Sequence, residues 1–408
     1  MEDHRDDFDR WLLDAGARST SVAALQNGYC RFLNRRGFKI RRCNFGGQTI
    51  HPLMNHTRTI WSDRAATPTY LDPTNIVSRR QYRFGEAMID EMHFIGDVGG
   101  PTYANSPFGR LDREGDFAIA IAPAGEPQPY PIFDDLAALG CTGYYAYGFD
   151  EYSGLRRRAA FATDRPGGYS DEQVEYLRYH LPRLGLVLRA LGESEIKQTL
   201  ARVYLGTDPG NRVCGGMITR GDIISVEAAI WFSDLRGFTA RSDDLDPQDL
   251  LRDLNAYFDC IGGAIYDVGG EVLKYIGDAV LAVFTTRAFG DRHAACAAAA
   301  DAAAQASTAL EDLNFDRAER GEAAIEHGVA LHVGEVHYGN IGSRERLDFT
   351  VIGREVNIAS RIEGLCKTLG ETMLCSATFA TEAPRPFRSV GSHAVKGVRD
   401  PIELFVPR

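Results

Sequence analysis

The pattern of apolar and polar residues changes character near residue 170. Before that point, a helix-like run covers residues 22–37. Segments rich in β-branched and aromatic residues, separated by Gly, Pro and Asn, follow it and predict strands. They lie at 38–45, 58–63, 116–123, 142–149 and 157–163. Strands in series with helices at the ends predict an α+β domain.

A long helix is predicted after residue 170. Ser170 and Gln173 fit a capping box. Apolar residues then recur at heptad-like spacing, at Val174, Leu177, Leu181, Leu184, Leu188 and Leu191. Such a seam packs along another helix, so it indicates either dimer pairing or a core helix of the first domain. Pro182 and Gly185 lie within the seam and predict a kink or a break.

The second half of the chain combines hairpins with helices. Residues 191–221 contain one more short helix and then many Gly and polar residues, which is typical of a connector. Asp246 and Pro247 predict a helix start. Its apolar face would consist of Leu250, Leu251, Leu254, Phe258, Ile261 and Ile265. The pattern predicts a sheet covered by helices, and three parts: 1–190, 191–221 and 222–408.

Composition excludes several classes of function. The 408 residues carry a net charge of -11, which argues against nucleic acid as the main partner. No run approaches the roughly 20 apolar residues of a membrane span, and the acidic first residues do not resemble a secretory signal. The eight cysteines form no CxxC pair. We therefore expect reduced thiols in a cytoplasmic protein, without zinc or disulfides.

Two aspartates stand where apolar strands end. Asp234 closes the run AIWFSD, and Asp278 follows a glycine inside EVLKYIGDAVLAVF, which predicts two strands around a tight turn. Each aspartate is either an ordinary turn residue or a cleft residue, because an unpaired buried charge is costly. Two carboxylates on neighbouring strands can hold two divalent cations for phosphoryl chemistry. The amides after Asp234, with Gly237 allowing close approach, could receive phosphate oxygens.

Three segments resemble the signatures of the class III nucleotide cyclase catalytic domain. They are FSDLRGFT at 232–239, GGEVLKYIGDAVLAVF at 269–284 and DFTVIGREVNIASRIEGL at 348–365. A fourth, VKGVRDPIELF at 395–405, is similar to the end of that domain. The resemblance covers about 222–408. It implies a ferredoxin-like fold and a homodimer with two active sites, each built from both chains.

Carried over by motif, the resemblance implies roles for individual residues. Asp234 and Asp278 would bind two Mg²⁺ or Mn²⁺ ions, and Lys274 and Thr350 would read the base. Asn357 would orient the ribose, and Arg361 would stabilise the transition state. The phosphates would meet Leu235, Arg236, Gly237, Phe238, Thr239, Lys396 and either Arg344 or Arg346. Although near in sequence, Lys274 and Asp278 would serve opposite active sites.

The base-reading pair bears on the substrate. Lys274 with Thr350 resembles the adenylate cyclase subgroup, some members of which respond to bicarbonate, whereas guanylate cyclases usually carry Glu with Cys or Ser. The resemblance thus implies conversion of ATP to 3′,5′-cyclic AMP and pyrophosphate. A guanylate cyclase and a catalytically idle nucleotide- or ligand-binding regulator are the alternatives. One departure is Arg354-Glu355 where the family often has Asp after VIG, a mildly unfavourable charge reversal at a helix start.

Residues 1–190 resemble a GAF-like sensor, a module that precedes cyclase domains in many bacterial proteins. The resemblance rests on TIHP at 49–52, SPF at 106–108 and the cap at 170–173. PAS-like or unrelated α+β folds are alternatives. The aromatic residues Tyr144, Tyr145, Tyr147 and Phe149 could line a pocket for a small-molecule ligand, although such a stripe more often forms core.

Overall fold

The computed structural model describes residues 2–63, 75–95, 101–152, 155–221, 223–238, 242, 245–396 and 398–408, without the side chains of 2–6 and 150–152. The chain forms two compact units, Met1–Leu200 and Ala201–Arg408. Each unit combines helices with one sheet, as the α+β prediction requires. Among the described residues, no helix has the length and apolar character needed to cross a membrane.

The first unit is built on a seven-stranded sheet with the order β3-β4-β2-β1-β7-β6-β5. Among the described residues, its strands pair antiparallel throughout. The strands are β1 (Ile40–His51), β2 (Met54–Ser62), β3 (Ile76–Phe84), β4 (Ala87–Phe94), β5 (Phe117–Ala120), β6 (Gly143–Tyr152) and β7 (Leu155–Thr163). The β3–β4 hairpin was not predicted from the sequence, because β3 is largely exposed and shows no apolar alternation.

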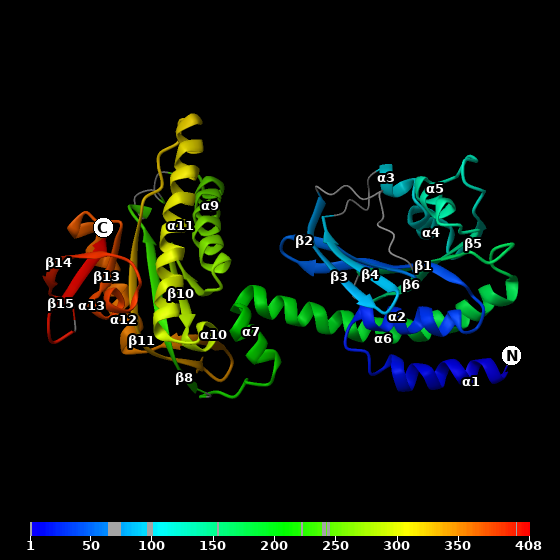
Figure 1. Cartoon of the computed structure of the whole chain (residues 1–408), viewed down its shortest axis with the longest axis horizontal. Coiled ribbons are helices and arrows are strands. Elements are labelled where there is room, and N and C mark those ends of the chain that lie inside the picture. The colour runs from blue at the N-terminus through cyan, green and yellow to red at the C-terminus, as the bar shows by residue number, and fades with distance from the viewer. Residues whose placement is uncertain are drawn as a thin grey trace. The chain divides into compact units, whose positions relative to one another are not determined.

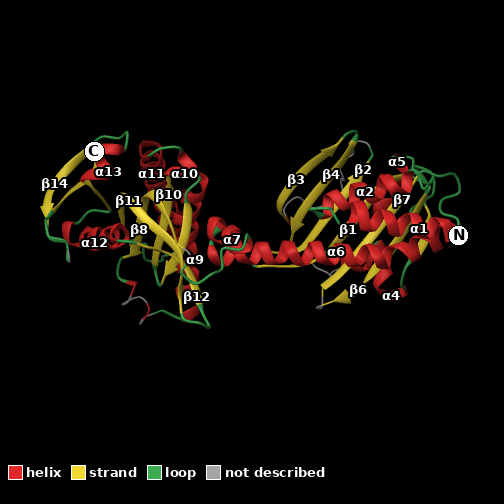
Figure 2. Ribbon diagram, turned by 90° about the horizontal axis from the view of Figure 1, so that it is seen from below, coloured by secondary structure: helices red, strands yellow, loops and turns green. Residues whose placement is uncertain are grey.

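Helices cover both faces of this sheet (Figure 1). One face carries α1 (Glu2–Trp11), a π-helical turn (Leu12–Gly16), α2 (Val22–Asn34) and α6 (Asp171–Leu205). Figure 2 shows α1, α2 and α6 in front of the strands. The other face carries α3 (Pro101–Ala104), α4 (Pro107–Glu114) and α5 (Pro131–Ala138). Tyr145 belongs to the first core and its neighbour Tyr144 to the second, since successive strand residues face opposite sides.

Helix α6 shows what the residues of the heptad-like seam pack against. Its residues Val174, Leu177, Leu181, Leu184 and Leu188 are buried in the core of the first unit, so the core-helix alternative is confirmed. The capping box is present, with reciprocal hydrogen bonds between Ser170 and Gln173. The predicted break is wrong, because α6 continues through Pro182 and Gly185. Packing of the leucines on the sheet compensates for the hydrogen bond that proline cannot donate.

The second unit is built on an eight-stranded sheet with the order β14-β15-β13-β11-β8-β10-β9, and β12 pairs with β11. Its strands are β8 (Ile223–Leu235), β9 (Glu271–Ile276), β10 (Ala279–Thr285), β11 (His327–Gly342), β12 (Leu347–Ile352), β13 (Met373–Ser376), β14 (Phe387–His393) and β15 (Ile402–Pro407). Its helices are α7 (Thr207–Cys214), α9 (Pro247–Asp267), α10 (Thr286–Phe289), α11 (Arg292–Glu319), α12 (Arg354–Leu369) and α13 (Ala377–Glu382).

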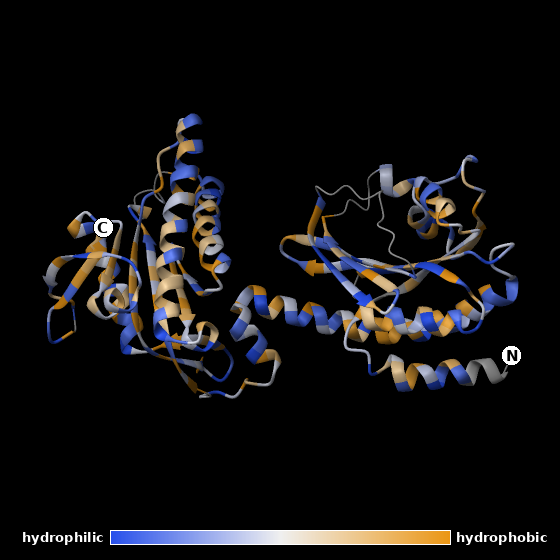
Figure 3. Cartoon of the chain, viewed as in Figure 1, coloured by the Kyte–Doolittle hydropathy of each residue, from blue (hydrophilic) through white to orange (hydrophobic). Residues whose placement is uncertain are grey.

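The chain order β8-α9-β9-β10-α11-β11 with the spatial order β11-β8-β10-β9 is the ferredoxin-like βαββαβ arrangement. Helices α9 and α11 cover one face, where Trp231 and Tyr257 are fully buried. Helix α12 covers the other face, through Ile358 and Ile362. Figure 3 shows hydrophobic residues gathered on the strands and on the helix sides that cover them.

Helix α9 begins as predicted, with Asp246 accepting a hydrogen bond from the Gln248 amide and Pro247 in the first turn. Its apolar face is narrower than predicted. Ile261 and Ile265 are buried, but Leu251 is 58% exposed. The prediction is wrong for Leu251, which lies about 120° around the helix from the buried Tyr257.

Candidate active site

Asp234 and Asp278 lie together at one end of the second sheet. Strands β8 and β10 are antiparallel neighbours with Val280 opposite Ser233, so Asp234, the next residue of β8, comes to the end of β10 that follows Asp278. The turn between β9 and β10 contains Gly277 at φ 66°, a backbone conformation that favours glycine. Burial, followed by a hydrogen bond with Asp278 and the charge of that carboxyl, raises the pKa of Asp234 to about 6. The two acids therefore share a proton or need a cation between them.

A third carboxyl group, which the sequence reasoning missed, faces the same place. Glu363 of α12 lies over Gly328 of β11, where a β-carbon would come within 2.5 Å of its Oε1 atom. Gly328 pairs with Asp234 across the sheet. Burial, and then the charge of Asp234, raise the pKa of Glu363 to about 7. Its position could have indicated this role in the sequence, because Glu363 lies inside the cyclase-like segment 348–365, two residues after Arg361.

The donor set suits a hard divalent cation. Carboxylate oxygens are the ligands that Mg²⁺ and Mn²⁺ prefer, and Asp234 and Asp278 supply them at hydrogen-bond distance from each other. Within the described residues, no group of three or more His, Cys, Asp or Glu side chains is arranged to hold a metal ion. Two carboxylates do not fill the shell of such a cation, so water or substrate oxygens would complete it.

Lys274 and Thr350 lie on β9 and β12, two strands that come close to each other without being neighbours in the sheet order. Lys274 of β9 forms an ion pair with Asp348 of β12. Asp348 and Thr350 are two residues apart on β12 and thus share one face of the strand. The sequence reasoning missed Asp348, although it lies only two positions before the predicted base-reading residue. The ion pair holds the Lys274 ammonium beside Thr350, while Asp278, on the same hairpin, turns toward β8.

Asn357 and Arg361 are exposed on α12. They are four residues apart, so they lie about one turn apart on the same face of the helix. The opposite face is fixed by the buried residues Ile358 and Ile362. Within the described residues, Arg361 forms no ion pair in the structure, so its guanidinium is available to an anionic partner.

The loop after β8 differs from the prediction. The Leu235 amide donates to Asp234 Oδ1 at 3.1 Å, and the Arg236 amide donates to the Glu326 carbonyl at 2.8 Å. Both amides are thus engaged within the chain, which leaves Gly237 and Phe238 as the described residues whose amides could meet phosphate. The Arg236 side chain donates to the Glu371 carbonyl at 2.5 Å. Thr239 lies outside the described residues.

The other predicted phosphate contacts are exposed. Lys396 lies between β14 and β15, and Arg344 and Arg346 lie in the loop between β11 and β12. Ser343 organises this loop, because its hydroxyl accepts the Arg346 amide at 3.1 Å. Among the described residues, none of these three basic side chains forms an ion pair with Asp234 or Asp278.

Of the unusual pair Arg354 and Glu355, Glu355 has a structural role, because it contacts a buried histidine. Its Oε2 atom lies 2.7 Å from Nε2 of His332, and Nδ1 of His332 lies 2.7 Å from the Ser376 hydroxyl. Burial lowers the pKa of His332, although Glu355 opposes this. A neutral imidazole that donates to Glu355 can accept from Ser376, so the buried ring is satisfied at both nitrogens. Arg354 is exposed.

The sequence of the second unit matches a known family model. The model of the "Adenylate and Guanylate cyclase catalytic domain" matches residues 225–406. These residues are a class III adenylate/guanylate cyclase catalytic domain. The match contains Asp234, Lys274, Asp278, Asn357 and Arg361, as the motif resemblance implies.

Curated relatives of the cyclase domain include adenylate cyclases. The adenylate cyclase of Anabaena cylindrica is 41% identical over 149 residues, which cover 36% of this chain and 28% of that protein. Adenylate cyclase 1 of Rhizobium meliloti (strain 1021) is 28% identical over 181 residues, which cover 44% of this chain and 27% of that protein. The matched part thus spans less than a third of the length of these relatives.

Solved cyclase structures also match the cyclase domain. The adenylyl cyclase CyaB from P. aeruginosa is 27% identical, covers 45% of this chain and 94% of that chain, and has a TM-score of 0.42. The guanylyl cyclase Cya2 is 30% identical, covers 46% of this chain and 93% of that chain, and has a TM-score of 0.40.

Proposed function

We propose that the chain is an adenylate cyclase that converts ATP to 3′,5′-cyclic AMP and pyrophosphate. The observation that carries the proposal is the contact between Asp234 and Asp278, which puts two carboxyl groups at one point of a cyclase domain. In the reaction, the ribose 3′-oxygen attacks the α-phosphorus of the same nucleotide, and the bond from that phosphorus to the bridging oxygen of pyrophosphate breaks.

Asp234 and Asp278 hold two Mg²⁺ or Mn²⁺ ions in this proposal. When bound, the ions lower the pKa of the ribose 3′-hydroxyl and neutralise the phosphate oxygens. The raised pKa of Asp234 supports this assignment, because a carboxyl pair that retains a proton near neutral pH gains from exchanging it for a cation. Glu363 adds negative potential beside the pair.

The polar residues outside the metal pair orient the nucleotide. Lys274 donates to the purine ring, and Thr350 donates or accepts beside it. The ion pair with Asp348 keeps Lys274 at the β12 strand that carries Thr350. Asn357 holds the ribose in the attacking geometry. Arg361 neutralises charge that grows in the transition state, a contribution of about 3 kcal/mol for one well-aimed group.

Contacts to the terminal phosphates come from Lys396, from Arg344 or Arg346, and from the amides of Gly237 and Phe238. All three basic residues are exposed and are therefore accessible to a triphosphate. The Lys274–Thr350 pair supports ATP over GTP through the subgroup resemblance, because guanylate cyclases usually carry Glu in this pair, whereas lysine cannot accept a hydrogen bond from the guanine amino group. Sensitivity to bicarbonate stays a prediction of the subgroup resemblance.

The active form is a homodimer with two shared sites. The exposed face of α12 carries Asn357 and Arg361, while the metal pair lies at the end of β8 and β10. In the proposal, Asn357 and Arg361 of one chain meet the metal pair of the other. Lys274 then serves one site and Asp278 the other, which accounts for their different partners, Asp348 and Asp234.

Residues 1–190 are a GAF-like sensor that regulates the cyclase domain of 222–408 through a connector at 191–221. The division of the chain after Leu200 and the length of α6, which runs to Leu205, support this organisation.

Incubation of the purified chain with ATP, GTP, CTP or UTP and Mn²⁺ tests the proposal. The expected product is 3′,5′-cyclic AMP from ATP, at a rate well above the cyclic product from any other nucleotide. Cyclic GMP as the main product would make the protein a guanylate cyclase. Absence of any cyclic nucleotide from a chain that binds ATP would favour an idle regulator.

A further inference from the structure

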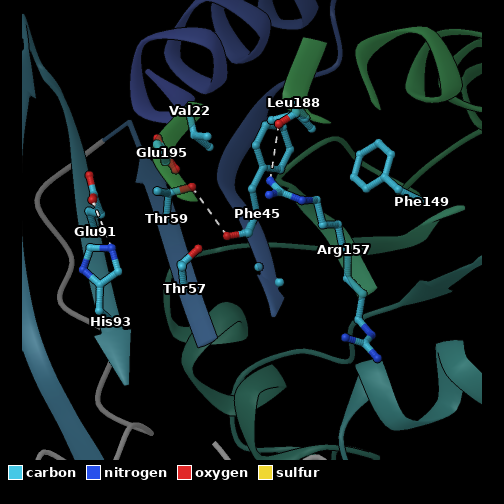
Figure 4. A pocket seen from close by; sticks show the side chains of 13 residues that line it. Val22, Phe45, Thr57, Thr59, Glu91, His93, Phe149, Arg157, Leu188 and Glu195 are labelled. Atoms are coloured by element: carbon cyan, nitrogen blue, oxygen red, sulfur yellow. Dashed lines mark hydrogen bonds and ion pairs between the residues drawn. The ribbon is translucent and has the colours of Figure 1, made fainter. Parts of the chain in front are cut away.

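An opening in the first unit combines charged and apolar side chains (Figure 4). It lies on the sheet face that α2 and α6 cover, and the space between the lining atoms is about 480 Å³, including the part open to solvent. Phe45 and Leu188 form its apolar wall. Only about 30 Å³ of it is open to the centre of a water molecule, so a bound molecule would lie partly in the mouth that is open to solvent.

Arg157 is a cation in this opening without an acidic partner. Among the described residues, its guanidinium forms no ion pair, and it donates only to the Leu188 carbonyl, at 3.3 Å. Burial lowers the pKa of Arg157, and the charges of Glu195 and Glu193 oppose this only in part. A guanidinium has five N–H donors and matches a carboxylate with two parallel hydrogen bonds. Most of its donors are therefore free for an anionic ligand.

Helix α6 is shaped to admit this side chain. A β-carbon at Gly192 would lie 1.8 Å from Nη2 of Arg157, and one at Gly185 would lie 2.9 Å from Cδ1 of Phe149, which also lines the opening. Glycine in a helix interior costs about 1 kcal/mol relative to alanine. The two glycines, seven residues apart on α6, therefore maintain the opening at the expense of helix stability.

The other side of the opening is acidic. Glu91 faces it beside His93, with 3.5 Å between Oε1 and Nε2. Glu195 stands at its exposed rim and accepts a hydrogen bond from the Val22 amide. Burial, and then the charge of Glu91, raise the pKa of Glu195. Burial lowers the pKa of His93, so this ring does not supply a stable positive charge between the two carboxylates.

Figure 4 shows Thr57 and Thr59 between Glu91 and Arg157. The Thr59 hydroxyl donates weakly to the Phe45 carbonyl, at 3.5 Å. The opening thus presents a cation at one end, two carboxylates at the other, hydroxyls between them and an apolar wall. This order of groups is complementary to a small zwitterion with an apolar side chain.

We propose that this opening binds a free amino acid, with its carboxylate on Arg157, its ammonium group between Glu91 and Glu195, and its side chain against Phe45 and Leu188. Leu188 and Glu195 belong to α6, which continues to Leu205 and leads into the second unit. A bound amino acid would therefore contact the helix that precedes the cyclase domain. This last step, the control of cyclase activity, rests on the function proposed above, whereas binding does not.

Thermal unfolding of the full chain with each of the twenty L-amino acids at 5 mM tests the site. The expected result is a rise in Tm of about 2 °C or more with at least one amino acid that has an apolar side chain. Leucine without its amino group, 4-methylpentanoate, and leucine without its carboxylate, isoamylamine, should give no comparable rise at the same concentration. An equal rise with 4-methylpentanoate would overturn the two-charge assignment, and no rise with any amino acid would overturn the site.

Two variants connect binding to Arg157. Arg157→Gln removes the charge, and Gly192→Ala displaces the guanidinium while favouring the helix. Both should abolish the rise in Tm, and Arg156→Gln, at an exposed neighbouring position, should retain it. Retention of the rise in both Arg157→Gln and Gly192→Ala would overturn the proposal. Cyclase assays with the same amino acid then test regulation separately, because a chain that binds it without a change in activity keeps the site and loses only the coupling.

Discussion

The carboxyl groups of Asp234 and Asp278 hydrogen-bond to each other where the end of β8 meets the turn between β9 and β10. Apolar strands bring them together: β8 and β10 are central strands whose residues Ile230 and Val283 are fully or almost fully buried. The sheet therefore fixes two acids that repel one another when both are ionised. This is the arrangement expected of a site whose stabilising partner is a cation.

The first prediction concerns the metal-free chain. Burial and Asp278 raise the pKa of Asp234 to about 6, above the unfolded value of about 4. The fold thus favours the protonated acid, so this group's contribution to stability falls as pH rises from about 4 to 6. Asp278→Asn removes the charge of Asp278 but not the burial, so it should weaken this dependence and stabilise the metal-free chain at pH 8 by about 1 kcal/mol, after allowance for solvent screening.

Urea unfolding with EDTA at pH 5 and pH 8 measures this difference. Mn²⁺ should stabilise the wild-type chain at pH 8 and have little effect on Asp278→Asn. Asp259→Asn, an exposed acid on α9, is the matched control and should behave as wild type. Equal stabilisation of wild type and Asp278→Asn by Mn²⁺ would remove Asp278 from the metal site.

The ion pair between Lys274 and Asp348 predicts an effect on substrate binding. Asp348→Asn keeps the shape of the side chain and removes the charge that holds the Lys274 ammonium beside Thr350. We expect KM for ATP to rise about tenfold with a smaller change in kcat, because loss of a ground-state contact acts on binding. Steady-state kinetics check this, with Glu345→Gln in the neighbouring loop as control. A change confined to kcat would contradict the assignment of Asp348 as a positioning residue.

The contact between His332 and Glu355 predicts an effect on stability. Glu355→Ala leaves Nε2 of a buried imidazole without its acceptor. The expected loss is about 2 kcal/mol in the free energy of unfolding, because an unsatisfied buried polar group costs about 1–3 kcal/mol. Arg354→Ala, at the exposed neighbouring position, should change stability by less than about 0.5 kcal/mol. Equal effects of the two substitutions would show that the hydrogen bond to His332 contributes nothing.

A separate dependence on pH comes from Glu271 at the start of β9. Its carboxylate accepts hydrogen bonds from the first amides of α7, at Thr207 and Asp208. Burial is the largest cause that raises the pKa of Glu271 to about 7, so its contribution to stability falls as pH rises from about 4.5 to 7. Glu271→Gln keeps an acceptor for α7 and should stabilise the chain at pH 8 by about 1 kcal/mol.

At pH 4.5, Glu271→Gln and wild type should have the same stability, since both carry a neutral side chain there. Glu335→Gln, whose side chain is 63% exposed, is the control and should show no dependence of this kind. If Glu271→Gln were less stable than wild type at pH 8, the charged carboxylate would stabilise α7 by more than its burial destabilises the chain, which would contradict the prediction.

The sequence predicted what depends on local patterns. The turn at Gly277, the caps of α6 and α9 and the apolar run of β8 each need only a few neighbouring residues, and each is present. The heptad-like seam was ambiguous, since leucines at that spacing fit a sheet surface as well as a second helix. Only the tertiary structure shows that they cover the first sheet.

The features that sequence reasoning missed are contacts between distant segments. Glu363 reaches Asp234 because α12 crosses β11 at Gly328, and Asp348 reaches Lys274 because β12 folds back beside β9. The Arg236 amide is engaged by Glu326, which no local pattern indicates. The opening beside Arg157 depends on Gly192, which in the sequence only weakens a helix prediction.

The central claim is that paired aspartates of one chain act with Asn357 and Arg361 of another. Mixing Asp234→Ala with Asn357→Ala tests it most directly, because each variant alone should be nearly inactive. After subunit exchange, half of the dimers are mixed and each has one intact site of two, so activity should return to about a quarter of wild type. Mixed dimers that form, as shown by differently tagged chains, yet stay as inactive as the separate variants would contradict the shared site.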